Sequence, residues 1–236
     1  MVDTNLSELA ENLDLQDMAG FTRKFVSDFS SALESKIDLD IDIDWSGVIC
    51  LGMGGSGAGG MYLKALSDDS GGLPFISWKD YNLPSWWGPD WLVIATSYSG
   101  NTEETLAGVR DALSSGGTVI GISSGGQLSE IIESHNDSVS IKIPSGQMPR
   151  SAFGHIFGTQ LAICWKLGLL PSPDRKYLSE MSNRLEITSM KNDILNEESS
   201  AVSLAKTLID KEIGIISSNL LSPAAYRFAC QLNENS

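Results

Sequence analysis

The chain has 236 residues, enough for one full domain and a substantial extra piece. Its formal net charge of −14 argues against general binding to nucleic acid and against binding to anionic membrane surfaces. No apolar run reaches the roughly 18 residues that a membrane helix needs, and the first residues lack the pattern of a secretory signal. The widely spaced Cys50, Cys164 and Cys230 predict reduced thiols in a cytoplasmic protein.

The N-terminal part is predicted to be helical. Residues 4–35 indicate two helical stretches, in which Phe21, Phe25, Phe29 and Leu33 recur every four positions as one apolar stripe. The following stretch, residues 38–44, alternates aspartate with leucine or isoleucine. We interpret this stretch as a linker or a sheet edge, because its acidic side chains must be solvated.

Strands and helices alternate through the middle of the chain. Strands are predicted at 48–51, 73–78, 91–96, 117–122 and 138–143. Helices are predicted after the glycine-rich segment that follows the first strand, and at 102–115, 127–134 and 150–169. This alternation predicts an α/β fold in which a five-stranded parallel sheet is covered by helices on both faces.

The C-terminal part is predicted to begin a second unit of the same kind. A polar connecting helix is followed by a helix from Ala201, a strand at 212–217 and a helix from Ser222. We therefore expect four parts: a helical segment 1–36, a first α/β domain 37–172, the connecting helix 173–199 and an incomplete second α/β domain 200–236. Such a short second unit must pack on the first domain or on chain beyond residue 236.

A glycine-rich segment joins the first predicted strand to its helix. The spacing of Gly52, Gly54 and Gly57 matches the dinucleotide fingerprint G-x-G-x-x-G, and the free amides at a helix start suit any phosphate. A P-loop is excluded because no lysine follows the last glycine, and a nucleophile elbow because Ala58 stands where it needs glycine. A dinucleotide site that uses Asp80 and a plain tight turn both stay open.

A second polar segment, residues 96–102, also joins a strand to a helix. It carries the hydroxyls of Ser97, Ser99 and Thr102. One hydroxyl is enough to cap a helix, so several at one helix start indicate a further role. We expect these hydroxyls to converge on one phosphate, because an acidic protein has to hold a dianion with locally oriented dipoles.

Four stretches together resemble a known family. Gly-Gly-Ser-Gly at 54–57 and Ser-Tyr-Ser-Gly-Asn-Thr-Glu-Glu-Thr at 97–105 resemble the SIS (sugar isomerase) domain. Met-Pro-Arg-Ser-Ala-Phe-Gly at 148–154 and Gln-Leu-Asn-Glu-Asn at 231–235 narrow the resemblance to the bifunctional phosphoglucose/phosphomannose isomerases of archaea and some bacteria. The resemblance implies a flavodoxin-like SIS fold. It covers the front two-thirds of a family with two SIS domains, so we expect a chain truncated within the second.

The resemblance implies a role for individual residues at the two polar segments. Gly55 and Ser56 would bind the substrate. Ser97, Ser99 and Thr102 would bind its phosphate.

The resemblance also implies the catalytic residues. Arg150 would bind the substrate and stabilise a developing cis-enediolate, a role that suits a fixed cation. Glu234 would be the catalytic base that moves a proton between two adjacent carbons. The family's ring-opening histidine and its C-terminal lysine have no counterpart in the sequence, since neither His135 nor His155 matches the family position. We therefore expect the 236-residue chain to be impaired as an enzyme.

The implied activity is the interconversion of glucose 6-phosphate, or mannose 6-phosphate, with fructose 6-phosphate. The resemblance implies a sugar-phosphate substrate, no cofactor, no metal and a homodimer. Two alternatives stay open: a non-catalytic SIS module that binds a sugar phosphate for regulation, and a nicotinamide-dependent oxidoreductase suggested by the G-x-G-x-x-G spacing alone.

Overall fold

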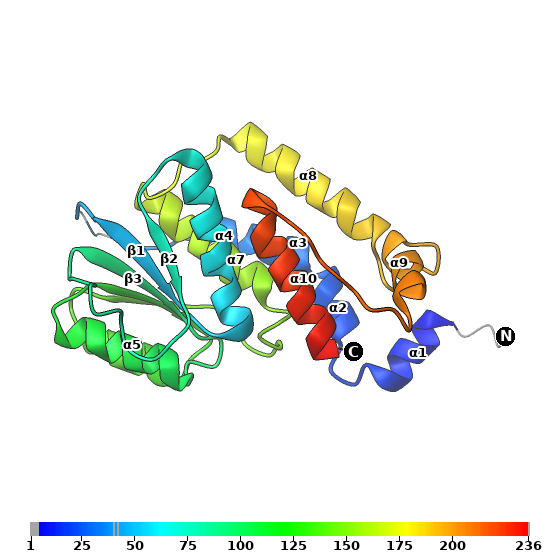
Figure 1. Ribbon diagram of the computed structural model, residues 1–236, viewed down its shortest axis with the longest axis horizontal. Helices are drawn as coiled ribbons and strands as arrows, with labels where there is room; N and C mark the ends of the chain where they lie inside the picture. The colour runs from blue at the N-terminus through cyan, green and yellow to red at the C-terminus, as the bar shows by residue number, and fades with distance from the viewer. Residues whose placement is uncertain (1–4, 40, 42, 236) are drawn as a thin grey trace.

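The computed structural model describes residues 5–39, 41 and 43–235. Its centre is a five-stranded sheet in the order β2-β1-β3-β4-β5, and each neighbouring pair is parallel (Figure 1). The prediction of a five-stranded parallel sheet is therefore confirmed. The strands are β1 Gly47–Leu51, β2 Phe75–Trp78, β3 Trp91–Thr96, β4 Val119–Ser123 and β5 Val139–Lys142.

Helices cover both faces of the sheet, as the alternation predicted. On β3, Leu92 and Ile94 join the apolar cluster that includes helices α3, α4 and α7, whereas Val93 and Ala95 join the cluster of α5 and α6. Successive strand residues point to opposite faces, so a fully apolar strand has to be buried on both sides. The helices of these layers are α3 Phe25–Glu34, α4 Gly54–Ser70, α5 Glu103–Ser114, α6 Gln127–Glu133 and α7 Phe153–Lys166.

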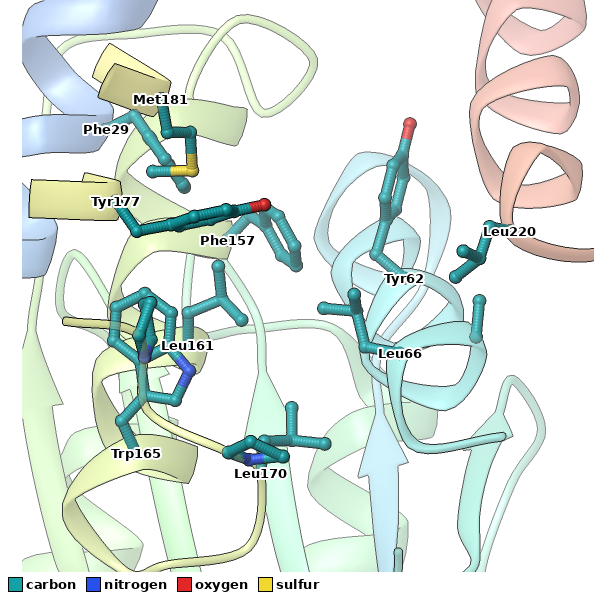
Figure 2. Close-up of a pocket in the computed structure, with 13 residues that line it drawn as sticks. Phe29, Tyr62, Leu66, Phe157, Leu161, Trp165, Leu170, Tyr177, Met181 and Leu220 are labelled. Carbon is teal, nitrogen blue, oxygen red and sulfur yellow. The ribbon is translucent and has the colours of Figure 1, made fainter. Parts of the chain in front are cut away.

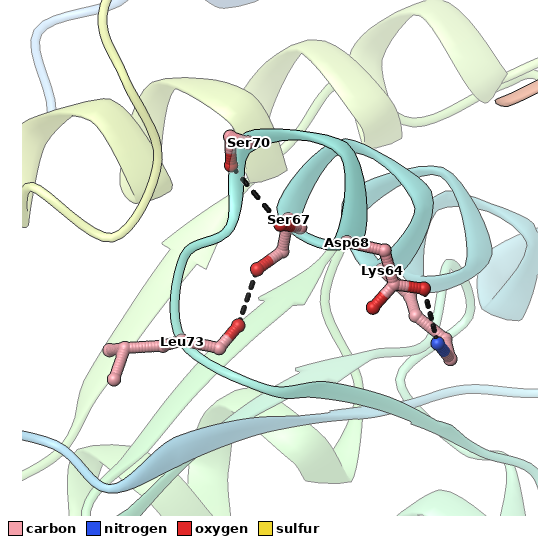
Figure 3. Close-up of polar contacts among 5 residues, drawn as sticks. All are labelled: Lys64, Ser67, Asp68, Ser70 and Leu73. Atoms are coloured by element: carbon pink, nitrogen blue, oxygen red, sulfur yellow. Dashed lines mark hydrogen bonds and ion pairs between the residues drawn. The ribbon is translucent and has the colours of Figure 1, made fainter.

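The C-terminal end of α4 is fixed by a compact set of polar contacts (Figure 3). Gly71 adopts a left-handed conformation with φ 68°, which is the usual way for a helix to stop. The Ser67 hydroxyl then donates to the carbonyl of Leu73, and Lys64 pairs with Asp68 one turn apart on the exposed side. These contacts turn the chain directly from α4 into β2.

The N-terminal segment forms three helices in the described residues, not the two predicted stretches: α1 Leu6–Leu13, α2 Met18–Arg23 and α3. The break comes at Lys24, so Phe21 lies on α2 and the stripe from Phe25 onward belongs to α3. Helix α3 lies directly on α7, because a Cβ at Gly154 would come within 2.8 Å of the carbonyl oxygen of Phe25. The described residues of 38–44 form no strand, and Asp40 and Asp42 lie outside the described residues.

The C-terminal part packs around the first layers rather than forming a second sheet. It consists of α8 Arg175–Lys191, α9 Ser200–Leu208, the short 3-10 turn η1 Asn219–Leu221 and α10 Ser222–Asn235. The predicted strand at 212–217 is wrong, because this segment is extended and exposed without strand pairing in the described part of the chain. Helix α10 packs against α4 (Figure 1). Within the described residues, no helix is both long and apolar enough to cross a membrane.

Candidate functional site

The sheet has a switch point between β1 and β3. These strands are neighbours, but the chain leaves β1 through α4 toward β2 on one side and leaves β3 through α5 toward β4 on the other. Ligands of doubly wound sheets bind outside the carboxyl ends of the strands at such a point. The first loop (residues 52–57) and the second loop (residues 97–102) both lie there.

Close backbone contacts shape the first loop. A Cβ at Gly57 would lie 2.1 Å from the carbonyl oxygen of Gly52, so only glycine lets α4 begin this close to the end of β1. A Cβ at Gly55 would lie 3.0 Å from the carbonyl oxygen of Pro149 and 3.3 Å from the backbone nitrogen of Arg150. The turn that carries Arg150 is therefore pressed against the start of α4.

Ser56 connects the two loops. Its side chain is buried, and its Oγ accepts a hydrogen bond of 3.1 Å from the backbone nitrogen of Tyr98. A buried backbone N–H needs a partner, so this contact fixes the spacing between the loops. The structure thus brings Gly55, Ser56, the second loop and the Arg150 turn to one edge of the sheet.

The second loop keeps its hydroxyls away from the capping role. Thr102 is the N-cap residue of α5, but its side chain does not accept from a helix amide. Instead Thr102 Oγ1 lies 2.8 Å from Ser97 Oγ in a hydroxyl–hydroxyl hydrogen bond. Ser99 is exposed on the same loop, where its Oγ accepts from the backbone nitrogen of Asn101 at 3.2 Å. The amides at the start of α5 therefore lie beside paired hydroxyls.

Arg150 lies in the turn before α7 and is half-buried. Its Nε is buried and has no hydrogen-bond partner among the described residues. An unpartnered buried donor is costly, so this guanidinium is suited to receive an oxygen from a ligand.

A polar network that the sequence did not predict holds the Arg150 turn. The backbone nitrogen of Gln147 donates to the Tyr98 hydroxyl at 2.8 Å, and its side-chain amide donates to Asp28 on α3 at 2.8 Å. The other carboxylate oxygen of Asp28 lies 3.5 Å from Nε2 of His155, which is buried on α7. Asp28 and Gln147 are 119 residues apart, so no local pattern signals their contact.

Glu234 lies near the end of α10 and is exposed. No hydrogen bond or ion pair joins Glu234 to the other candidate site residues in the described part of the chain. Its neighbour on α10, Arg227, has an Nη2 that donates to the carbonyl oxygen of Arg150 at 2.9 Å, and the charge of Glu234 acts to raise the pKa of Arg227. Glu234 was predicted as a site residue from the sequence, whereas Arg227 was not. Arg227 lies seven residues before Glu234 and therefore on the same face of the helix, and this spacing was the available signal.

Two of the three cysteines are unsuited to nucleophilic chemistry. Cys50 and Cys164 are buried, and burial raises the pKa of Cys50 to about 12 and the pKa of Cys164 well above its ordinary value. A thiol that stays protonated is a poor nucleophile. In the described part of the chain, no three His, Cys, Asp or Glu side chains are grouped so as to hold a metal ion.

An apolar cavity of about 410 Å³ lies elsewhere, beside the middle of α4 (Figure 2). Tyr62 and Leu66 border it on one side, and Phe157, Tyr177 and Met181 border it on another. Its lining is almost entirely hydrophobic, which does not suit a phosphate.

Comparisons with known proteins show which named proteins the chain is similar to. No protein-family profile matches the chain. It is 37% identical over 206 residues to a bifunctional phosphoglucose/phosphomannose isomerase of Caldicellulosiruptor bescii, covering 80% of this chain and 60% of that protein. A protein of the same name from Aquifex aeolicus is 31% identical over 81% of this chain and 56% of its own length. A D-glucosamine-6-phosphate 4-epimerase of Sulfolobus acidocaldarius is 34% identical over 78% of this chain and 55% of its own length.

The chain thus spans little more than half the length of these relatives. Among solved structures, the C-terminal domain of glucosamine-fructose-6-phosphate aminotransferase from Francisella tularensis aligns with a TM-score of 0.66 at 17% identity, over 92% of this chain and 67% of that one. Tagatose-6-phosphate ketose/aldose isomerase from Escherichia coli aligns with a TM-score of 0.55 at 15% identity, over 98% and 64%. These likenesses establish the fold.

Proposed function

We propose that the protein is an aldose–ketose isomerase that interconverts glucose 6-phosphate, or mannose 6-phosphate, with fructose 6-phosphate. The observation that carries the proposal is the hydroxyl pair of Ser97 and Thr102, which is not used to cap α5 and is tied to the first loop through Ser56. The similarity to named phosphoglucose/phosphomannose isomerases supports it. The family resemblance adds a homodimer to the proposal.

The second loop would bind the phosphate. In the proposed complex Ser97 and Thr102 give up their contact with each other, and both of them and Ser99 donate to phosphate oxygens, with the amides at the start of α5 as further donors. Hydrogen bonds to an ionised acceptor are about twice as strong as neutral ones. A phosphate is therefore a better partner for these hydroxyls than they are for each other.

Arg150 and Glu234 would carry the chemistry, while Gly55 and Ser56 would bind the substrate. In the open-chain aldose, the Glu234 carboxylate removes the proton from C2, and the electron pair moves to the C1 oxygen to form a cis-enediolate. The guanidinium of Arg150 donates hydrogen bonds to the developing negative charge. The hydroxyl proton on O2 then passes to O1, Glu234 returns its proton to C1, and the carbonyl forms at C2, which gives the ketose.

Binding tests the phosphate site. We expect the chain to bind fructose 6-phosphate in a calorimetric titration, and to bind fructose not at all. Ser97→Ala and Thr102→Val should each weaken binding at least tenfold, because each removes a hydrogen bond to a charged group worth about 1.5–3 kcal/mol. Ser114→Ala, at the far end of α5, is the matched control and should bind as the wild type does. Equal affinity of all variants would contradict the assignment.

Proton exchange separates an isomerase from a module that only binds. In D2O, an enediolate intermediate exchanges the carbon-bound hydrogen of fructose 6-phosphate with solvent, which NMR detects. Glu234→Gln should abolish this exchange and leave the affinity for fructose 6-phosphate within about threefold, whereas exposed Glu212→Gln should change neither. This exchange needs only the open-chain ketose that is present in solution, and not the ring-opening groups without a counterpart in the sequence. Binding without exchange by the wild-type chain would therefore support the regulatory module instead. Glucosamine 6-phosphate belongs in the same titration, because one similar protein is named as an epimerase of that sugar.

A further inference from the structure

Arg227 makes an unusual set of contacts at the edge of the site. Its Nη2 donates to the carbonyl oxygen of Arg150 at 2.9 Å, and its guanidinium carbon lies 4.1 Å from the centre of the Phe153 ring. Phe153 is the first residue of α7. The Arg227 side chain therefore contacts both the turn that carries Arg150 and the start of α7.

The charge of Arg227 has no close carboxylate. The described ion pairs join Arg23 to Asp193, Lys64 to Asp68 and His155 to Asp28, and none includes Arg227. Burial lowers the pKa of Arg227, while the charges of Tyr62, Glu234 and Cys230 act to raise it. Buried cations are normally paired, and this chain has 30 acidic residues against 16 basic ones. Arg227 is half-buried, and the groups that it contacts directly are neutral. Its position therefore needs a reason other than keeping the protein soluble.

The place of Arg227 on α10 supplies that explanation. Glu234 follows Arg227 by two helical turns and lies on the same face, because seven residues correspond closely to two turns. The exposed end of a helix frays readily, so a carboxylate there has no fixed position by itself. Two turns earlier, α10 is bonded to the Arg150 turn through Nη2 of Arg227, in addition to its packing on α4.

We propose that Arg227 is a positioning residue, which fixes α10 against the Arg150 turn and so aligns the Glu234 carboxylate with the switch-point site. The inference rests on the proposed function for its catalytic consequence. The contact between α10 and the Arg150 turn stands without that function. Planar stacking on Phe153 together with a directed hydrogen bond suits a guanidinium, and a lysine in its place supplies only a point charge.

Thiol labelling tests the docking of α10. Cys50 and Cys164 are buried, whereas Cys230 lies on α10 one turn after Arg227 and is half-buried. We expect Arg227→Ala to raise the rate at which Cys230 reacts with a disulfide reagent at least tenfold, and Arg227→Lys to raise it less. Arg184→Gln, on the exposed side of α8, is the matched control and should react as the wild type does. An unchanged labelling rate in Arg227→Ala would overturn the proposal.

Exchange and binding of fructose 6-phosphate test the catalytic consequence. We expect Arg227→Ala to lower hydrogen exchange in D2O at least 100-fold while the dissociation constant stays within about threefold, and millimolar guanidinium to restore part of the exchange. A role in general stability alone predicts that exchange and affinity fall together with no rescue, and this result would overturn the inference. If the wild-type chain binds no sugar phosphate, the proposed function fails, and the labelling rates alone then support or overturn the docking role of Arg227.

Discussion

The two loops at the switch point are neighbours, yet they are built in different ways. In the first loop, Gly55 and Gly57 make room for backbone that lies too close for any side chain. In the second loop, Ser97 and Thr102 are bonded to each other although a helix start beside them lacks a side-chain cap. Packing accounts for the glycines without any ligand, whereas the hydroxyls of Ser97 and Thr102 contact each other and the Thr102 backbone nitrogen without capping the first turn of α5. The hydroxyls are therefore the better evidence for a bound phosphate.

The largest effect expected from this comparison is at Gly57. Gly57→Ala should lower the free energy of unfolding by about 3 kcal/mol or more, because its Cβ would meet the backbone of Gly52 and neither can yield without moving α4 from β1. Urea unfolding followed by circular dichroism measures it. Gly214→Ala is the matched control, since nothing lies within 4 Å of its Cβ position, and it should stay within about 0.5 kcal/mol of the wild type. A stable Gly57→Ala protein would remove the packing explanation.

A smaller effect is expected at Ser56, which joins the loops. Ser56→Ala should cost about 2 kcal/mol in the same experiment, because the buried backbone nitrogen of Tyr98 would lose its acceptor. Ser99→Ala removes a hydroxyl from an exposed position of the second loop and should cost less than about 0.5 kcal/mol. Equal costs at the two serines would mean that the loops are not fixed to each other through Ser56.

The smallest effect concerns Cys50 on β1. Its side chain packs against α4 at Gly60, where an added Cβ would lie 2.6 Å from the Cβ of Cys50. Burial raises the pKa of Cys50 from 9.0 to about 12, so between these values the folded state keeps a proton that the unfolded state loses. The contribution of this thiol to the free energy of unfolding is therefore fully present below pH 9 and is lost as the pH rises from 9 to about 12. From pH 8 to pH 10, wild-type protein should lose on the order of 1 kcal/mol more of its free energy of unfolding than Cys50→Ala.

Urea unfolding under reducing conditions at the two pH values measures this difference. Cys164 offers a second variant, because burial also raises its pKa and its substitution should change the pH dependence in the same direction. Parallel pH profiles for the wild type and Cys50→Ala would show that the thiol is not shielded from water beneath α4.

The sequence predicts those parts of the structure whose causes are local. The apolar runs around Ile49 and Val93 predicted buried strands, because a strand covered on both faces has to be apolar throughout. The segment 212–217 has an equally good strand pattern but forms none, since a strand also needs a neighbour to pair with. Local periodicity carries no information about that neighbour.

The same limit applies to the candidate site. Within each of the two loops the residues are close in sequence, so the glycine-rich turn of the first loop and the hydroxyls of the second could be recognised from the sequence. The contacts of Asp28 with Gln147 and of Arg227 with Arg150 join residues 119 and 77 positions apart. Such contacts arise from how α3 and α10 pack on the sheet layers, which the amino-acid pattern of either helix does not specify.

The extended segment 212–217 has a consequence for the behaviour of the protein in solution. Ile213, Ile215 and Ile216 are 42%, 36% and 98% exposed, with no strand alongside in the described residues. At low ionic strength the net charge of −14 keeps molecules apart. Salt shortens the range of that repulsion to about 3 Å at 1 M and leaves the attraction between isoleucines intact. Aggregation on salting should therefore begin at this stretch.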